Sequence, residues 1–285
     1  MKNLLFAFFI SGIFFSCKGS KDQSAKDSIG TDSLANTQEA LIKKFGPIIQ
    51  GVWVEKGYID KLGETKSPIA STDFEGYISS MKINVGQNAV DSITVPAIWG
   101  NHEGGDTRLI FKPGKQKNTL LFRLGEQGNL GELAYSIENN DTILTTYLPD
   151  EKRKGKFFIS KYIKIFNTNA GNEGEGLYYA VNKKIISGNY ASIDSTGKNM
   201  NIIFTNDGKL TGIPDLNGYS INIDFDGGPP NNMDEISFLK NEKVLQSYTF
   251  KIKADTLKLY ETRLNADSTE YILDKLKYKL VRQKK

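Results

Sequence analysis

The sequence predicts an all-β protein made of two tandem antiparallel barrels or half-barrels, preceded by one short helix. Tyr, Phe and Gly are abundant, with 13, 16 and 27 residues against only 8 Pro, which favours short strands joined by tight turns. Apolar and polar residues alternate along Met81–Val85 and Leu133–Ile137, as they do in half-buried strands. At 285 residues with 39% apolar content, the chain can bury one large core or two small ones.

The first residues are typical of an exported protein. Lys2 precedes the apolar run Leu4–Phe15, which is shorter than the roughly 20 residues that a membrane-spanning helix requires. We therefore interpret residues 1–16 as a signal peptide. Ser16-Cys17 resembles the lipobox at which bacterial lipoproteins are cleaved and acylated, which makes Cys17 the expected site of palmitate-type lipid attachment. The alternative is an ordinary secretory peptide with an unrelated cysteine.

Acylation would hold the protein on a membrane through its N-terminus. Lys18 follows the cysteine in place of Asp, which favours the outer membrane by the enterobacterial sorting rule and leaves open which face is used.

Residues 17–36 are polar and predict a flexible tether. Residues 37–45 predict a short helix that Gly46-Pro47 ends. The net charge of +4 is too small to indicate a nucleic-acid-binding protein.

The remainder of the chain reads as two divergent copies of one unit. Ile48–Val54 has a counterpart in Ile185–Ala191, with apolar pair, glycine and aromatic residue in the same order. Between the copies, the Gly- and Asn-rich segment Asn167–Gly176 is typical of an exposed linker. We therefore expect a first domain at 37–166, a linker at 167–177 and a second domain at 178–285.

These residues carry a resemblance to a known family. A Gly-x-Trp opening strand after a short helix, followed by hairpins and a last strand ending in Arg282, resembles the lipocalin and fatty-acid-binding (calycin) barrels, especially lipocalin-like modules of Bacteroidetes lipoproteins. The resemblance implies that Trp53 and Tyr190 plug the barrel floors and that Arg282 packs across Tyr190. The second copy departs from it in having Tyr for Trp, and the first offers Lys164 or no basic partner in place of Arg.

One short motif suggests metal chemistry. Gly100-Asn-His-Glu103 looks like a signature of the calcineurin-like metallophosphoesterases, but such two-metal sites need several imidazoles and this chain has one histidine. The motif lies between the strand-like runs Ile93–Trp99 and Arg108–Phe111, which predicts a hairpin loop. A stray ion held by His102, Glu103 and Asp106 is the alternative. We predict no metal site.

Three other segments invite functional interpretations. Gly171–Gly176 has the wrong glycine order for a dinucleotide-binding turn. Asp224–Glu235 is read as a solvated hairpin connection, with a bound cation as the alternative. Asp150–Lys156 is read as a charged hairpin tip, with contact to anionic head groups as the alternative.

No nucleophile–base pair or distinctive pair of carboxylates is visible, so we predict no catalytic residues, no cofactor and no enzyme activity.

Two functions remain: a structural or protein-interaction module of the cell envelope, or a protein that binds a small apolar ligand. The strand Tyr248–Ile252 would point its large side chains inward against Ile221 and Ile223, leaving little room in the second barrel.

The first barrel has smaller side chains among its strands, at Ala97, Ala134 and Thr145. Any ligand is therefore expected in the first barrel near Trp53 or Trp99, the only two tryptophans.

Overall fold

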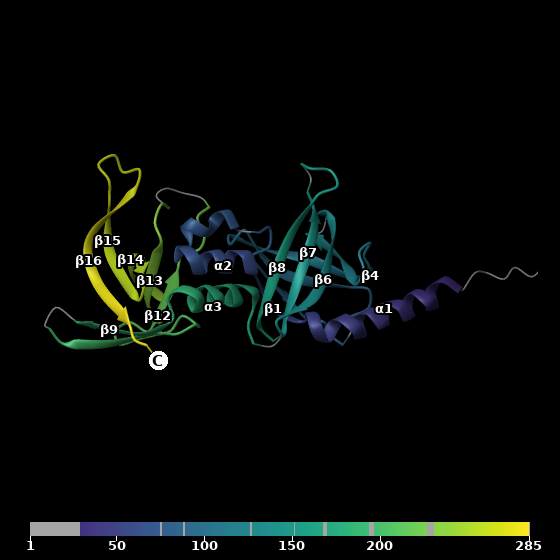
Figure 1. Cartoon of the computed structure of the whole chain (residues 1–285), viewed down its shortest axis with the longest axis horizontal. Coiled ribbons are helices and arrows are strands. Elements are labelled where there is room, and N and C mark those ends of the chain that lie inside the picture. The colour runs from purple at the N-terminus through teal and green to yellow at the C-terminus, as the bar shows by residue number, and fades with distance from the viewer. Residues whose placement is uncertain are drawn as a thin grey trace, which may run out of the picture.

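The computed structural model of the chain confirms the predicted all-β class (Figure 1). The structure describes residues 29–284 except 75, 88, 126, 151, 168–169, 194–196 and 227–230. The predicted signal peptide and Cys17 lie outside the described residues. Two eight-stranded antiparallel sheets follow one another along the chain, and each begins directly after a helix.

The first sheet is a closed barrel in which consecutive strands pair and β8 pairs back with β1. Its strands are β1 (Gly51–Glu55), β2 (Ser80–Ile83), β3 (Ser92–Trp99), β4 (Glu103–Pro113), β5 (Thr119–Leu124), β6 (Leu130–Glu138), β7 (Asp141–Pro149) and β8 (Phe157–Phe166). Helix α1 (Ile29–Ile49) leads into it, and α2 (Lys56–Thr65) and the 3-10 helix η1 (Ile69–Phe74) are inserted between β1 and β2.

The second sheet has the same cyclic order and is nearly closed. Helix α3 (Glu173–Ile185) leads into β9 (Gly188–Ile193), β10 (Asn199–Phe204), β11 (Leu210–Thr211), β12 (Gly218–Ile221), β13 (Glu235–Lys240), β14 (Lys243–Lys253), β15 (Thr256–Leu264) and β16 (Tyr271–Arg282). Strand β16 pairs with β9, so the gap in the ladder falls between β11 and β12. An isolated bridge joins Lys209 to Gly218 across that gap.

In the first barrel, the junction of helix and sheet is an aromatic clamp. The Trp53 ring is fully buried, and its Nε1 donates a hydrogen bond of 2.7 Å to the carbonyl of Ile49 in the last turn of α1. Lys164, opposite Trp53 in the β1–β8 ladder, places its Nζ 4.8 Å from the Trp53 ring centroid and donates to the carbonyl of Ile48. A cation thus lies on the aromatic face and binds the end of the helix.

The second barrel repeats this clamp with different residues. The Tyr190 hydroxyl donates to the carbonyl of Ile186, again at 2.7 Å. The guanidinium carbon of Arg282 lies 4.9 Å from the Tyr190 ring centroid. Its nitrogens donate to the carbonyls of Ile185 and Ser187 and to the Tyr190 hydroxyl. The expectation that Arg282 packs across Tyr190 is confirmed, and Lys164 is the basic partner in the first copy.

Helix α1 is longer than predicted at both ends. It begins at Ile29, so residues 29–36, which were expected to belong to the tether, are helical. It also continues through Pro47 to Ile49, although Gly46-Pro47 was expected to end it. Proline in the last turn removes one helical hydrogen bond, and this loss is offset because Phe45 and Ile49 are buried in the core of the first barrel.

The segment predicted as an exposed linker is partly helical. Helix α3 begins at Glu173, and a capping box forms in which the Asn172 side chain accepts from the Glu175 amide while the Glu175 carboxylate accepts from the Asn172 amide. Gly176 and Leu177 are buried. The glycines of this segment suggested an exposed linker, but Gly176 is required for close packing of α3 on β1. A Cβ at Gly176 would overlap Cγ1 of Val52 on the outer face of β1.

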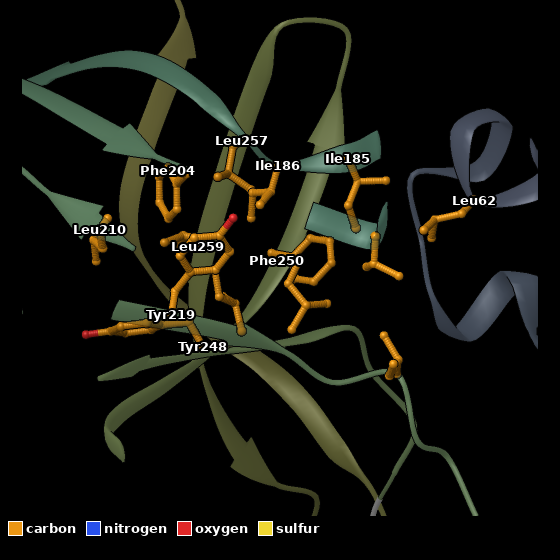
Figure 2. Packing of buried hydrophobic residues seen from close by; sticks show 14 of the residues in the cluster. Leu62, Ile185, Ile186, Phe204, Leu210, Tyr219, Tyr248, Phe250, Leu257 and Leu259 are labelled. Atoms are coloured by element: carbon orange, nitrogen blue, oxygen red, sulfur yellow. The ribbon is translucent and has the colours of Figure 1, made fainter. Parts of the chain in front are cut away.

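The apolar core of the second barrel extends to the outer face of the first barrel, while the interior of the first barrel forms a separate cluster. Figure 1 shows α2 and α3 lying between the two sheets. Val54, Tyr58 and Leu62, from β1 and α2, join the same buried cluster as the interior of the second barrel. Figure 2 shows Leu62 of α2 reaching toward Ile185 of α3 beside that interior. None of the helices in the described part of the chain is long and apolar enough to cross a membrane.

Polar contacts join the halves as well. His102, in the turn after β3, places Nδ1 2.7 Å from Oδ2 of Asp224, beyond β12. This hydrogen bond raises the pKa of His102, and the negative charge of Asp224 adds to the effect. The Ile69 amide of η1 donates to the Asp234 carboxylate at 3.0 Å. Burial raises the pKa of Asp234.

The contact between α3 and β1 leads to a first prediction. Gly176→Ala should lower the free energy of unfolding, because the new methyl overlaps the side chain of Val52, which is fully buried. Overpacking of this kind costs about 1–3 kcal/mol, which exceeds the gain of about 1 kcal/mol from replacing a helical glycine. Denaturant unfolding of the purified chain measures the change.

Gly174→Ala is the matched control in the same helix. The nearest atom to a Cβ at Gly174 is Oδ1 of Asn172 at 3.4 Å, an ordinary contact. This variant should leave the stability unchanged or raise it by up to about 1 kcal/mol. Equal effects of the two substitutions would contradict the close packing of α3 on β1.

Candidate functional site

The interior of the first barrel is filled by its own side chains. The buried cluster inside it includes Trp53, Met81, Phe111, Phe122 and Tyr162, each fully buried. A cavity large enough for an apolar ligand would leave the side chains around it accessible. With its ring buried and its N–H bonded to Ile49, Trp53 could meet a ligand only if the floor of the barrel opened.

The small side chains that suggested a cavity do not all face the interior. Leu133 and Leu144 belong to the core cluster, while their strand neighbours Ala134 and Thr145 do not. Successive side chains of a strand point to opposite faces, so Ala134 and Thr145, which pair with each other, lie on the outer face of the barrel. Ala97 does face inward, and larger neighbours fill the space around it.

Trp99 lies instead at the mouth of the first barrel, at the end away from α1. There it lines an open pocket of about 510 Å³. Tyr77 and Phe158 line the same pocket and meet edge to face, with ring centroids 5.1 Å apart. The structure therefore separates the two tryptophans: Trp53 is in the sealed floor, and Trp99 is half-buried at the mouth, where it packs against the core of the first barrel.

Beneath this pocket lies a group of polar side chains from β1, β7 and β8. Glu55 pairs with Tyr162, and Thr146 pairs with Ser160. A Cβ at Gly76, which lines the pocket, would lie 3.0 Å from the Ser160 hydroxyl oxygen and 3.4 Å from Cγ of Glu55. The polar groups are thus immediately under the aromatic rim.

Burial controls the ionisation of this group. It raises the pKa of the Glu55 carboxyl, although hydrogen bonds from the amides of Tyr58 and Gly57 at the start of α2 oppose the shift. It also raises the pKa of Tyr162, which is fully buried. Because Glu55 caps α2, its position has a structural cause. Glu55, Thr146 and Tyr162 are buried, and of the four polar side chains only Ser160 lines the pocket itself.

The Gly100-Asn-His-Glu motif is a hairpin turn, as predicted, because β3 ends at Trp99 and β4 begins at Glu103. His102 Nε2 lies 3.9 Å from the Glu103 carboxylate, while its Nδ1 is occupied by Asp224. No group of three or more His, Cys, Asp or Glu side chains in the described residues is placed to hold a metal ion.

The two charged segments also fall in connections. Asp150–Lys156 forms the tip between β7 and β8, where the Asp150 carboxylate accepts bonds from the amides of Lys152 and Arg153. Asp224–Glu235 connects β12 to β13, and residues 227–230 of it lie outside the described residues.

Sequence reasoning identified Trp99 and missed the residues around it. Tyr77 lies in the connection after η1 and Phe158 near the start of β8, far from Trp99 in the chain. The aromatic pair Phe157-Phe158 at the start of a strand was an available signal. The strand register that places Glu55 beside Tyr162 was not readable from local patterns.

Comparison of the chain with protein families, with curated proteins and with solved structures finds no match.

Proposed function

We propose that the protein is a non-catalytic interaction module of the cell envelope, exported and held at the outer membrane by a lipid on Cys17. The main support is that both barrels are filled by their own side chains, which leaves the outer surface as the place for recognition. In the second barrel, Ile221 is buried inside, as predicted, and so are Tyr248 and Phe250, which Figure 2 labels.

The mouth of the first barrel is the surface best suited to a partner. Tyr77 is 53% exposed, Phe157 47% and Ile159 60%, and they lie next to the pocket of Trp99 or in it. Clusters of exposed apolar and aromatic side chains are typical of binding surfaces. The charged tip with Arg153 borders this cluster, since its guanidinium lies 5.9 Å from the Phe158 ring centroid.

Binding of a small apolar ligand is the second candidate, and one observation favours it. The pocket at Trp99 combines an aromatic rim with hydroxyl groups beneath it, as small-molecule sites often do. Such a ligand would sit at the mouth of the first barrel and not inside it.

The anchor is tested by metabolic labelling with a palmitate analogue. The wild-type protein should take up the label, and Cys17→Ser should not, because Cys17 is the only cysteine in the chain. Equal labelling of both proteins, or none in either, would end the anchor proposal without affecting the description of the fold.

The interaction function is tested by placing a photo-crosslinking residue at Ile159 in the expressing cells. Light should produce one adduct of defined mass, because a partner that covers the mouth would contact this side chain. Ile193, which is 67% exposed on β9 of the second barrel, is the control position and should give no such adduct.

Identical adducts at Ile159 and Ile193, or none at either, would count against an interaction surface at the mouth. The small-ligand candidate has a separate signature in the same protein. Titration with fatty acids would then change the tryptophan emission saturably, and Trp99→Phe would remove the change.

A further inference from the structure

A second open site lies beside α3, between the two barrels. We call it the α3 groove. It has a volume of about 770 Å³ and is bounded by the exposed side of α3, the end of β8, the β10–β11 turn and β12. This volume is within the range of about 300–1,000 Å³ usual for small-molecule sites.

Aromatic rings form much of its surface. Phe166 and Tyr179 meet edge to face, with ring centroids 4.8 Å apart, and Tyr219 contributes from β12. Tyr178 also lines the groove and is 42% exposed, which is unusual for so large a ring on a helix that is packed on both sides. Ring faces carry partial negative charge and attract C–H groups of slight positive charge.

Amide side chains hold one wall of the groove in place. Nδ2 of Asn182 donates to the carbonyl of Asn206 at 3.1 Å, and Nδ2 of Asn206 donates to the Tyr179 hydroxyl at 3.0 Å. The Tyr219 hydroxyl donates to the carbonyl of Thr205 at 2.7 Å. The β10–β11 turn is thus fixed from both sides, and a preorganised wall reduces the entropy that binding costs.

One buried acceptor in this wall is unused. Asn182 is only 3% exposed, and its Oδ1 has no hydrogen-bond partner among the described residues. Buried polar atoms are nearly always paired, so a free acceptor beside a groove favours a ligand or water that supplies a donor.

The two acidic side chains of the groove are engaged within the protein. None of the described residues that line it is Lys, Arg or His, so it offers no cationic side chain to an anion. Its two carboxylates are engaged: Glu175 in the capping box of α3, and Asp207 with Lys209 at 2.7 Å and with Thr205. The ion pair and hydrogen bonds lower the pKa of Asp207. A basic peptide would therefore have to displace the Asp207–Lys209 ion pair or the capping box of α3 to bind these carboxylates.

From these features we infer that the α3 groove binds an uncharged oligosaccharide. Sugar rings present C–H faces that stack on aromatic rings, and their hydroxyls both donate and accept, as amide side chains do. The inference goes beyond the proposed function, because it assigns a ligand class to a site separate from the mouth of the first barrel and requires no lipid anchor.

The test uses the whole purified chain and neutral tetrasaccharides of glucose and of N-acetylglucosamine, titrated by calorimetry. At least one should bind saturably with a Kd on the order of 0.1–1 mM. Tyr178→Ala should weaken that binding about tenfold or more, because the exposed ring supplies a stacking face. Ile137→Ala, which shortens an exposed apolar side chain of β6 that does not line the groove, should bind like the wild type.

Hydrogen exchange gives an independent readout on the same protein. Saturating sugar should slow exchange in residues 172–182 and 205–208 and leave the β3–β4 turn unchanged. The inference would be overturned if no tetrasaccharide bound at millimolar concentration, if Tyr178→Ala bound as well as the wild type, or if only oligolysine bound. Failure of the anchor or of the crosslinking experiment would not affect this result.

Discussion

The packing of α3 against β1 at Gly176 is the contact on which the rest of the structure depends. On one side, α3 lies so close to the outer face of the first barrel that only a glycine fits beside Val52. On the other, Leu177, Val181 and Ile185 belong to the core of the second barrel. One helix therefore covers one barrel and completes the other, which makes the two sheets a single packed body.

The two copies solve the same problem with different chemistry. Each barrel must satisfy the carbonyls at the end of the helix that enters it. The first uses the indole N–H of Trp53 and the ammonium of Lys164, and the second uses the Tyr190 hydroxyl and the forked guanidinium of Arg282. The arginine reaches two carbonyls and the tyrosine at once, as a lysine could not. The two barrels thus share this geometry, although the sequence segments that build it are only weakly alike.

The strands, their hairpins and the repeated Gly-x-aromatic unit were predictable because alternation and turn residues are local signals. Helix α3 was not, since the glycine that suggested a linker is explained only by a contact with β1, more than a hundred residues away. The candidate site was half predictable. Trp99 stood out in the sequence as one of two tryptophans. Whether Ala134 points into the barrel or outward depends on strand register, which the sequence does not reveal. Tyr77 and Phe158 are brought beside Trp99 only by the fold.

The α3 groove takes its walls from both barrels, so it exists only while the two barrels stay in a fixed relation. Differential scanning calorimetry tests this most directly. If the packing of α3 on the outer face of the first barrel couples the two barrels, the chain should unfold in a single transition whose calorimetric and van't Hoff enthalpies agree. Two resolved transitions, each with the enthalpy expected for one barrel, would contradict this coupling.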